Sequence, residues 1–143
     1  MKKSHQKQAQ SCTGNALVEF ALVLPVLLML VFGIVELSLA LYDKAIITNA
    51  SREAARAGVI FRVPALTNAQ ISAIATDYCT NNLVTFGGAS QPNVTVTQTG
   101  GTTAGNELKI TVTYEYTGLL LGNMISAFTG GKLLSASTTM IYE

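Results

Sequence analysis

One stretch decides the fold of this chain: Gly14–Arg56, which reads GNALVEFALVLPVLLMLVFGIVELSLALYDKAIITNASREAAR. Its first part is apolar, its second part is polar and rich in alanine, and no glycine or proline marks the passage from one to the other. Alanine and leucine favour helix, whereas Gly and Pro end it. The pattern therefore predicts one long helix that begins apolar and continues into a polar part.

The apolar part, Phe20–Tyr42, is long enough to cross a membrane. Its 23 residues would extend about 34 Å as a helix, and a bilayer core of about 30 Å needs about 20 apolar residues. Pro25 removes one backbone hydrogen bond from this helix and predicts a kink. The kink is either tolerated near one membrane face or a functional bend, and the sequence leaves both interpretations open.

Charge is distributed unevenly along the chain. Charged residues make up 12% of the sequence, against about 25% in soluble domains, and mean hydropathy is +0.39. The segment Met1–Gly14 carries Lys2, Lys3 and Lys7 and no acid, which leaves six basic and eight acidic side chains in the rest. A basic flank stays on the cytoplasmic side of a membrane span. The slightly acidic remainder gives no basis for nucleic-acid binding.

Two carboxylates accompany the apolar run: Glu19 lies directly before it, and Glu36 interrupts it. A charge buried in a membrane is costly unless it finds a partner. Glu36 lies near the far end, so it either reaches the lipid headgroups or serves assembly. If the chain is cut after Gly14, Asn15 supplies a new α-amino group four residues before Glu19. In a helical stack of copies, Glu19 of one subunit would then neutralise the amine of its neighbour.

Two other interpretations of this segment have to be weighed. In an ordinary secretory signal peptide, Ser38-Leu39-Ala40 would be the cleavage site, but the apolar run exceeds the usual length of about 7–15 residues and contains Pro25 and Glu36. An uncleaved single-pass anchor that carries a binding or scaffold domain has the same hydropathy pattern.

The polar continuation, Leu39–Gly58, predicts a helix that packs closely on a sheet. A face of small and aliphatic residues supports this: Ile46, Ile47, Ala50, Ala54, Ala57 and Gly58. Charged residues on the other side form either a solvated face or a candidate subunit contact: Arg52, Glu53 and Arg56. The helix is expected to end between Gly58 and Val63, ahead of a proline.

The rest of the chain predicts a second helix and three strands. Thr67 and Gln70 form a capping box, and the helix that follows is expected to bury one stripe and to end at Asn81-Asn82; the stripe is Ile71, Ile74, Ala75 and Tyr78. Alternating apolar residues predict an antiparallel sheet with a hairpin of two strands and a third strand at the end: Asn93–Thr99, Glu107–Tyr116 and Leu133–Tyr142. The fold class is therefore α+β.

Residues for catalysis are missing from the body of the chain. The single histidine, His5, lies in the leader, so no Ser–His or Cys–His pair can form in the body. No His/Cys cluster offers a metal site, and no glycine-rich loop opens a helix after a strand. We expect no enzyme activity, no cofactor and no metal. Cys12 lies in the leader, and Cys79 is expected to be a partly buried free thiol rather than bonded to another chain.

The motif Gly14-Asn-Ala-Leu-Val-Glu19-Phe20 resembles the processing site of type IV prepilins, and its extension to Gly58 resembles the TadE-like pseudopilins of tight-adherence (Flp) pilus systems. The resemblance implies a pilin-like form of the α+β fold. It also implies that a prepilin peptidase cuts after Gly14, that Asn15 becomes the new terminus, that Glu19 aids assembly and that Phe20 completes the motif.

The resemblance further implies a setting. The expected parts are a cleaved leader (1–14), a transmembrane and assembly helix (15–42) and an extracytoplasmic domain (43–143). The expected location is the bacterial inner membrane, in contact with lipid, with the N-terminus cytoplasmic. Partners would be the prepilin peptidase, other pilins or pseudopilins, and the assembly machinery, in a homo- or hetero-oligomer. The size of the domain favours a minor component that takes part in pilus assembly and adhesion; a subunit of a related secretion pseudopilus is the alternative.

Overall fold

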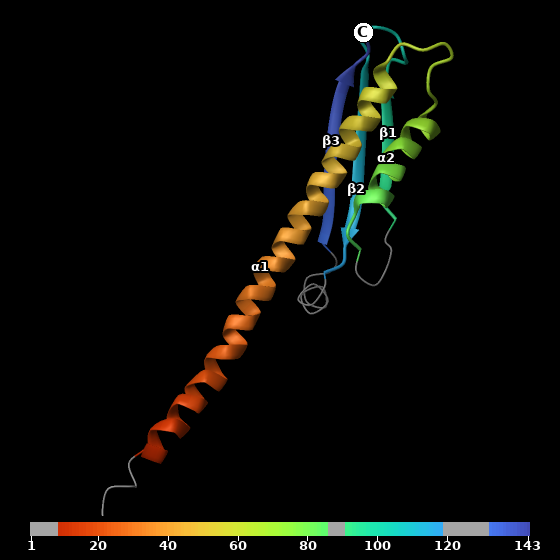
Figure 1. Ribbon diagram of the computed structural model, residues 1–143. Coiled ribbons are helices and arrows are strands. Elements are labelled where there is room, and N and C mark those ends of the chain that lie inside the picture. Colours follow the sequence, from red (N-terminus) through yellow and green to blue (C-terminus); the bar gives the residue numbers. More distant parts are fainter. Residues whose placement is uncertain (1–8, 86–90, 119–131) are drawn as a thin grey trace, which may run out of the picture. The chain divides into compact units, whose positions relative to one another are not determined.

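The structure, a computed structural model, describes residues 9–85, 91–118 and 132–143 (Figure 1). Two helices and three strands follow one another along the chain: α1 (Ala9–Val59), α2 (Asn68–Asn82), β1 (Asn93–Thr99), β2 (Glu107–Tyr116) and β3 (Lys132–Ile141). The α+β class, the pilin-like order of elements and the three-stranded sheet predicted from the sequence are confirmed.

The chain divides into two compact units, Met1–Val35 and Glu36–Glu143. The first holds the N-terminal part of α1, and the second holds the rest of α1 and all other elements. Residues 1–8 of the basic leader lie outside the described residues. Helix α1 ends at Val59, within the interval that the sequence predicted.

The sheet has the order β1-β2-β3 and is antiparallel throughout. Its register places Val94 opposite Val112, and Val112 opposite Ala136. Along β2, buried residues alternate with exposed or half-buried ones, as the period of a strand with one covered face requires. The predicted hairpin and the alternation along its second strand are confirmed.

One face of the sheet carries the core of the second unit. The C-terminal part of α1 and all of α2 lie on this face (Figure 1). The fully buried positions of the helices are mostly small residues of α1 and one stripe of α2, so the helix backbones approach the sheet closely: Ile47, Ala50, Ala54, Ala55, Ile71, Ala75 and Cys79. The small-residue face predicted for α1 is thus the one that packs.

Helix α2 begins as predicted but buries a slightly different stripe. Thr67 is the N-cap, and its hydroxyl accepts the backbone N–H of Gln70 while its own backbone N–H donates to the Gln70 side chain. The fully buried line is Ile71, Ala75 and Cys79, whereas Ile74 and Tyr78, predicted to be buried, are only half-buried. Ile74 and Tyr78 form the neighbouring line of the helix, which packs against the core but is only partly covered by it.

The third strand is displaced by one residue from its prediction. It runs from Lys132, which pairs with Tyr116, to Ile141, so Tyr142 lies beyond its end. Tyr142 instead donates its backbone N–H to the carbonyl of Asn106 in the turn between β1 and β2.

None of the described helices covers the other face of the sheet. That face is rich in hydroxyl groups, and one row crosses all three strands through Thr95, Thr111 and Ser137. The hydroxyls of Thr111 and Ser137 lie 3.2 Å apart and form a hydrogen bond.

Candidate functional site

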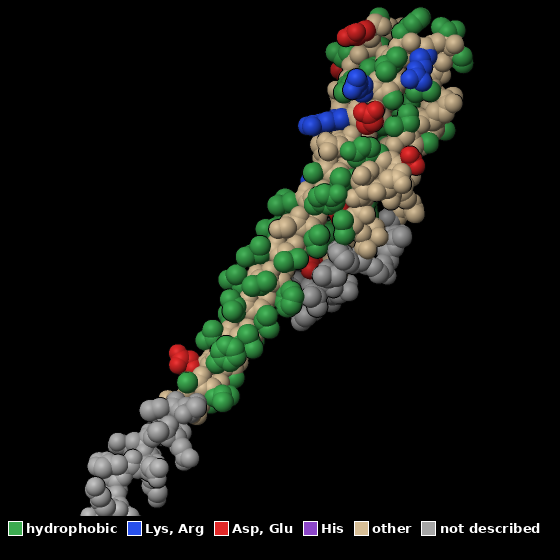
Figure 2. Space-filling view, in the orientation of Figure 1, with side chains coloured by type: hydrophobic (Ala, Val, Ile, Leu, Met, Phe, Trp, Pro, Cys, Tyr) green, Lys and Arg blue, Asp and Glu red, His purple; other side chains and the backbone are tan. Residues whose placement is uncertain are grey.

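The N-terminal part of α1 is a bare apolar helix. Within Gly14–Val59, an 18-residue window has a mean hydropathy of 2.7, and none of that window is buried. Figure 2 shows hydrophobic side chains over this part of the helix. Among the described residues, this is the one helix whose length and composition suit a membrane span. These properties are consistent with a single-pass membrane anchor.

Gly14 lies in the exposed first part of this helix. A Cβ atom at this position would meet no other atom within 4 Å, so the space around the glycine is open. Glycine also lowers helix stability by about 1 kcal/mol relative to alanine. The predicted cleavage site is therefore accessible, and its helix is easier to open locally than its neighbours.

Asn15 and Glu19 lie one turn apart in α1, about 6 Å along its axis, and therefore on the same side of the helix. Glu19 is flanked by the exposed side chains of Val18 and Phe20, so its carboxylate stands within an apolar surface. The structure thus supports the predicted geometry between the two positions, whereas cleavage before Asn15 stays a prediction.

Pro25 lies inside α1, as predicted. A proline has no backbone N–H, so the carbonyl of Ala21 lacks the donor that position 25 would otherwise supply. In a membrane, a neighbouring helix can satisfy such a carbonyl. The role predicted for Pro25 in assembly stays a prediction.

Glu36 is the first residue of the second unit. The hydroxyl of Tyr116, at the end of β2, donates a hydrogen bond of 3.4 Å to the backbone carbonyl of Glu36. This contact ties the helix turn at Glu36 to the sheet. The role predicted for the Glu36 side chain in assembly stays a prediction.

Asp43 is a buried acid that the sequence analysis missed. Its side chain is fully buried, and one carboxylate oxygen accepts the backbone N–H of Val84 at 3.1 Å. The second oxygen and the nearby Tyr114 hydroxyl have no partner among the described residues. Burial raises the pKa of the Asp43 carboxyl, and the bond from Val84 offsets part of that shift. In the sequence, Asp43 falls between Ala40 and Ile47 at the spacing of the buried face of α1. That spacing is the signal that could have identified Asp43 as a buried residue.

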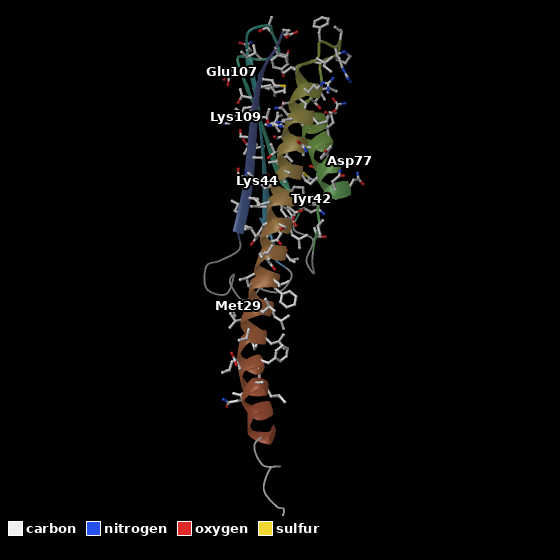
Figure 3. All side chains as sticks on the ribbon, turned by 60° about the vertical axis from the view of Figure 1, so that its left-hand side comes forward. Met29, Tyr42, Lys44, Asp77, Glu107 and Lys109 are labelled. Carbon is white, nitrogen blue, oxygen red and sulfur yellow. The ribbon has the colours of Figure 1, made fainter. Side chains whose placement is uncertain are left out.

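Two further polar residues of α1, also missed, hold β3. The ammonium group of Lys44 donates to the backbone carbonyl of Ser135 (Figure 3). The hydroxyl of the fully buried Ser51 forms a hydrogen bond of 2.7 Å with the hydroxyl of Thr138. Together with Asp43, they fix α1 to the domain directly after the predicted membrane span.

The three charged residues predicted as a candidate subunit contact come together in a surface groove. Its volume is about 440 Å³, and α1, α2 and β3 all contribute to its walls: Arg52, Glu53, Arg56, Tyr78, Thr138 and Met140. Neither arginine forms an ion pair within 4.0 Å with a carboxylate of the described residues. Within the part of the chain that the structure describes, no three His, Cys, Asp or Glu side chains gather as metal ligands.

Comparison with protein families gives a match that covers most of α1. Residues 14–56 match the family model of the TadE-like proteins. The N-terminal segment is thus similar to the TadE-like proteins. This family is associated with the assembly of tight-adherence (Tad) pili. The TadE-like match starts at Gly14, where the predicted leader ends, and includes Asn15, Glu19, Pro25 and Glu36. Comparisons with curated proteins and with solved structures give no match.

Proposed function

We propose that the chain is a minor pilin or pseudopilin of a tight-adherence pilus, made as a precursor that a prepilin peptidase cuts after Gly14. One observation carries the proposal: the TadE-like match begins at the residue that separates the basic leader from the exposed apolar helix. The open surroundings of Gly14 support its access to a peptidase.

Assembly would follow from the chemistry of the new terminus. After cleavage, the α-amino group of Asn15 and the carboxylate of Glu19 would both lie in an apolar stack of helices. Each charge alone is costly to bury, so a carboxylate of one copy placed against the amine of the next lowers the cost of both. Exposed side chains such as Leu17 and Leu22 would supply the packing surface.

The setting follows from the same proposal. The N-terminus lies in the cytoplasm, α1 crosses the inner membrane once in contact with lipid, and the α+β domain lies outside the cytoplasm. Prepilin peptidase, other pilins and the assembly machinery are the partners. The domain after residue 42 favours a minor subunit, at a tip or in an initiating complex, that contributes to surface adhesion.

The mature N-terminus tests processing directly. Mass spectrometry of the protein extracted from its native membrane should find a chain that starts at Asn15, and Gly14→Leu should block this conversion. A chain that keeps Met1 would favour the uncleaved anchor, and a chain that starts at Leu41 would favour a secreted protein.

Substitutions of Glu19 test assembly separately from processing. Glu19→Ala and Glu19→Gln should leave membrane insertion and cleavage intact while pili lose most of their content of this subunit, because the neighbouring amine is left without a counter-charge. Glu107→Gln, an exposed acid on the sheet, is the matched control and should have no effect. Unchanged incorporation of Glu19→Gln would contradict the pairing.

A further inference from the structure

Arg52 and Arg56 present two positive charges that form no ion pair with a carboxylate of the described residues. Both side chains are exposed, and the residues lie one turn apart on α1, about 6 Å along its axis. Like charges at this spacing destabilise a helix. Glu53 lies in the same groove but pairs with neither arginine within 4.0 Å. The groove is therefore arranged to accept carboxylates from outside, which guanidinium groups bind through paired N–H donors.

The groove also offers apolar contact. Tyr78 of α2 and Met140 of β3 are half-buried in its walls. The volume of the groove, about 440 Å³, is large compared with the roughly 30 Å³ that one water molecule occupies, so the groove can hold several side chains.

We propose that this groove docks a segment of another protein that carries two carboxylates about 6 Å apart, beside a large apolar side chain. Figure 2 shows Lys and Arg side chains beside Asp and Glu side chains over the part of the domain that holds the end of α1. Charge complementarity selects an acidic partner, and the apolar part of the groove wall selects a polypeptide over a free anion, because phosphate would leave Tyr78 and Met140 uncovered.

A lipid surface is a poorer occupant of the groove. Arg56 lies fourteen residues beyond Tyr42, the end of the predicted span, which corresponds to about 21 Å along α1. Attraction to lipid headgroups falls off within a Debye length, about 8 Å at physiological ionic strength. The proposal deepens the proposed function and rests on it in one respect, since the partner is then expected to be another subunit of the assembly.

Site-specific photo-crosslinking in the native host cell tests the proposal on the full chain. The photoreactive residue p-benzoylphenylalanine replaces Tyr78 in the groove, and in a control chain it replaces Lys109. Lys109 lies on the sheet face away from α1 (Figure 3). We expect an adduct only from position 78, to a peptide that contains at least two Asp or Glu residues. The adduct should fall at least fivefold in Arg52→Glu/Arg56→Glu and in the milder Arg52→Gln/Arg56→Gln.

A charge exchange completes the test. When the two acids of the crosslinked peptide are changed to lysine, the adduct should return with Arg52→Glu/Arg56→Glu and be lost with the wild-type arginines. No adduct at position 78, an adduct to lipid, an adduct to a peptide without acids, or no rescue by the exchange would each overturn the proposal. The N-terminal mass of the same samples separates the docking proposal from the proposed function. If cleavage after Gly14 is normal but no adduct forms, the docking proposal fails and the proposed function stands.

Discussion

Gly58, in the last turn of α1, lies directly over Leu108 of β2. A Cβ atom at position 58 would come within 2.5 Å of the Cδ2 atom of Leu108 and within 3.0 Å of the Cδ1 atom of Ile71. Both neighbours are fully buried, so they have little space to move. The absence of a side chain at Gly58 is what lets α1 and α2 share the same face of the sheet at this end.

Gly58→Val should lower the free energy of unfolding by about 1–3 kcal/mol, because overpacking forces Leu108 and Ile71 from their positions. Gly58→Ala should cost much less, since the atoms it meets are methyl groups and alanine gains about 1 kcal/mol of helix propensity. Thermal unfolding of the full chain in detergent, followed by far-UV circular dichroism, measures both. A valine variant as stable as the wild type would disprove the close packing.

Because Asp43 is buried, we expect the free energy of unfolding to depend on pH. Burial raises its folded pKa above the ordinary value of 3.8, so ionisation costs more in the folded chain than in the unfolded one. The free energy of unfolding should therefore fall as pH rises from about 3.8 through the raised pKa, and stay lowered above it.

Asp43→Asn should remove this pH dependence. The amide keeps an oxygen for the N–H of Val84 and carries no charge, so the advantage of the variant over the wild type should grow across that pH window. Melting temperatures at several pH values measure it, with the exposed Asp77→Asn as control. An advantage of equal size at every pH would rule out the buried charge as its cause.

Ser51 and Thr138 form a pair whose loss should be strongly non-additive. Ser51→Ala leaves the Thr138 hydroxyl half-buried without its partner, which costs about 1–3 kcal/mol. Thr138→Val alone should have a similar effect, whereas the double variant should lose less than the sum of the two. Urea unfolding of the four proteins gives the coupling free energy, and a value near zero would mean that the hydrogen bond contributes nothing.

Cys79 should be an unreactive thiol in the folded protein. It is free and fully buried, and burial raises its pKa from 9.0 to about 11, so the folded chain holds about a hundredfold less thiolate than an exposed cysteine would. N-ethylmaleimide at pH 8 should label Cys79 only after unfolding, as read by peptide mass spectrometry. Cys12, where the leader is retained, serves as the internal comparison, and rapid labelling of both would contradict the burial.

Much of the fold could be predicted because local patterns agree with it. The capping box at Thr67, the alternation along Glu107–Tyr116 and the small residues of α1 each act over a few residues, and each appears in the structure as expected. The burial of Cys79 was also predicted, although it is complete where the prediction was partial. The one-residue displacement of β3 depends instead on where Tyr142 finds its hydrogen-bond partner, which is a contact between distant segments.

The polar contacts of the site could not be predicted for the same reason. Asp43 bonds to a residue 41 positions away and Lys44 to one 91 positions away, so nothing near either residue in the sequence indicates its partner. The groove around Arg52 needed three separate elements to meet. In contrast, Asn15 and Glu19 lie one helix turn apart. Helix geometry alone therefore predicted that both residues lie on the same side of α1.

The uncovered row of hydroxyls on the sheet has an evolutionary consequence. Thr95, Thr111 and Ser137 contribute little to the packed interior, so related chains could exchange them for other polar residues without unfolding the domain. Substitutions can therefore accumulate on this side while the helix-bearing side stays constrained by packing, and sequence variation among relatives should concentrate here.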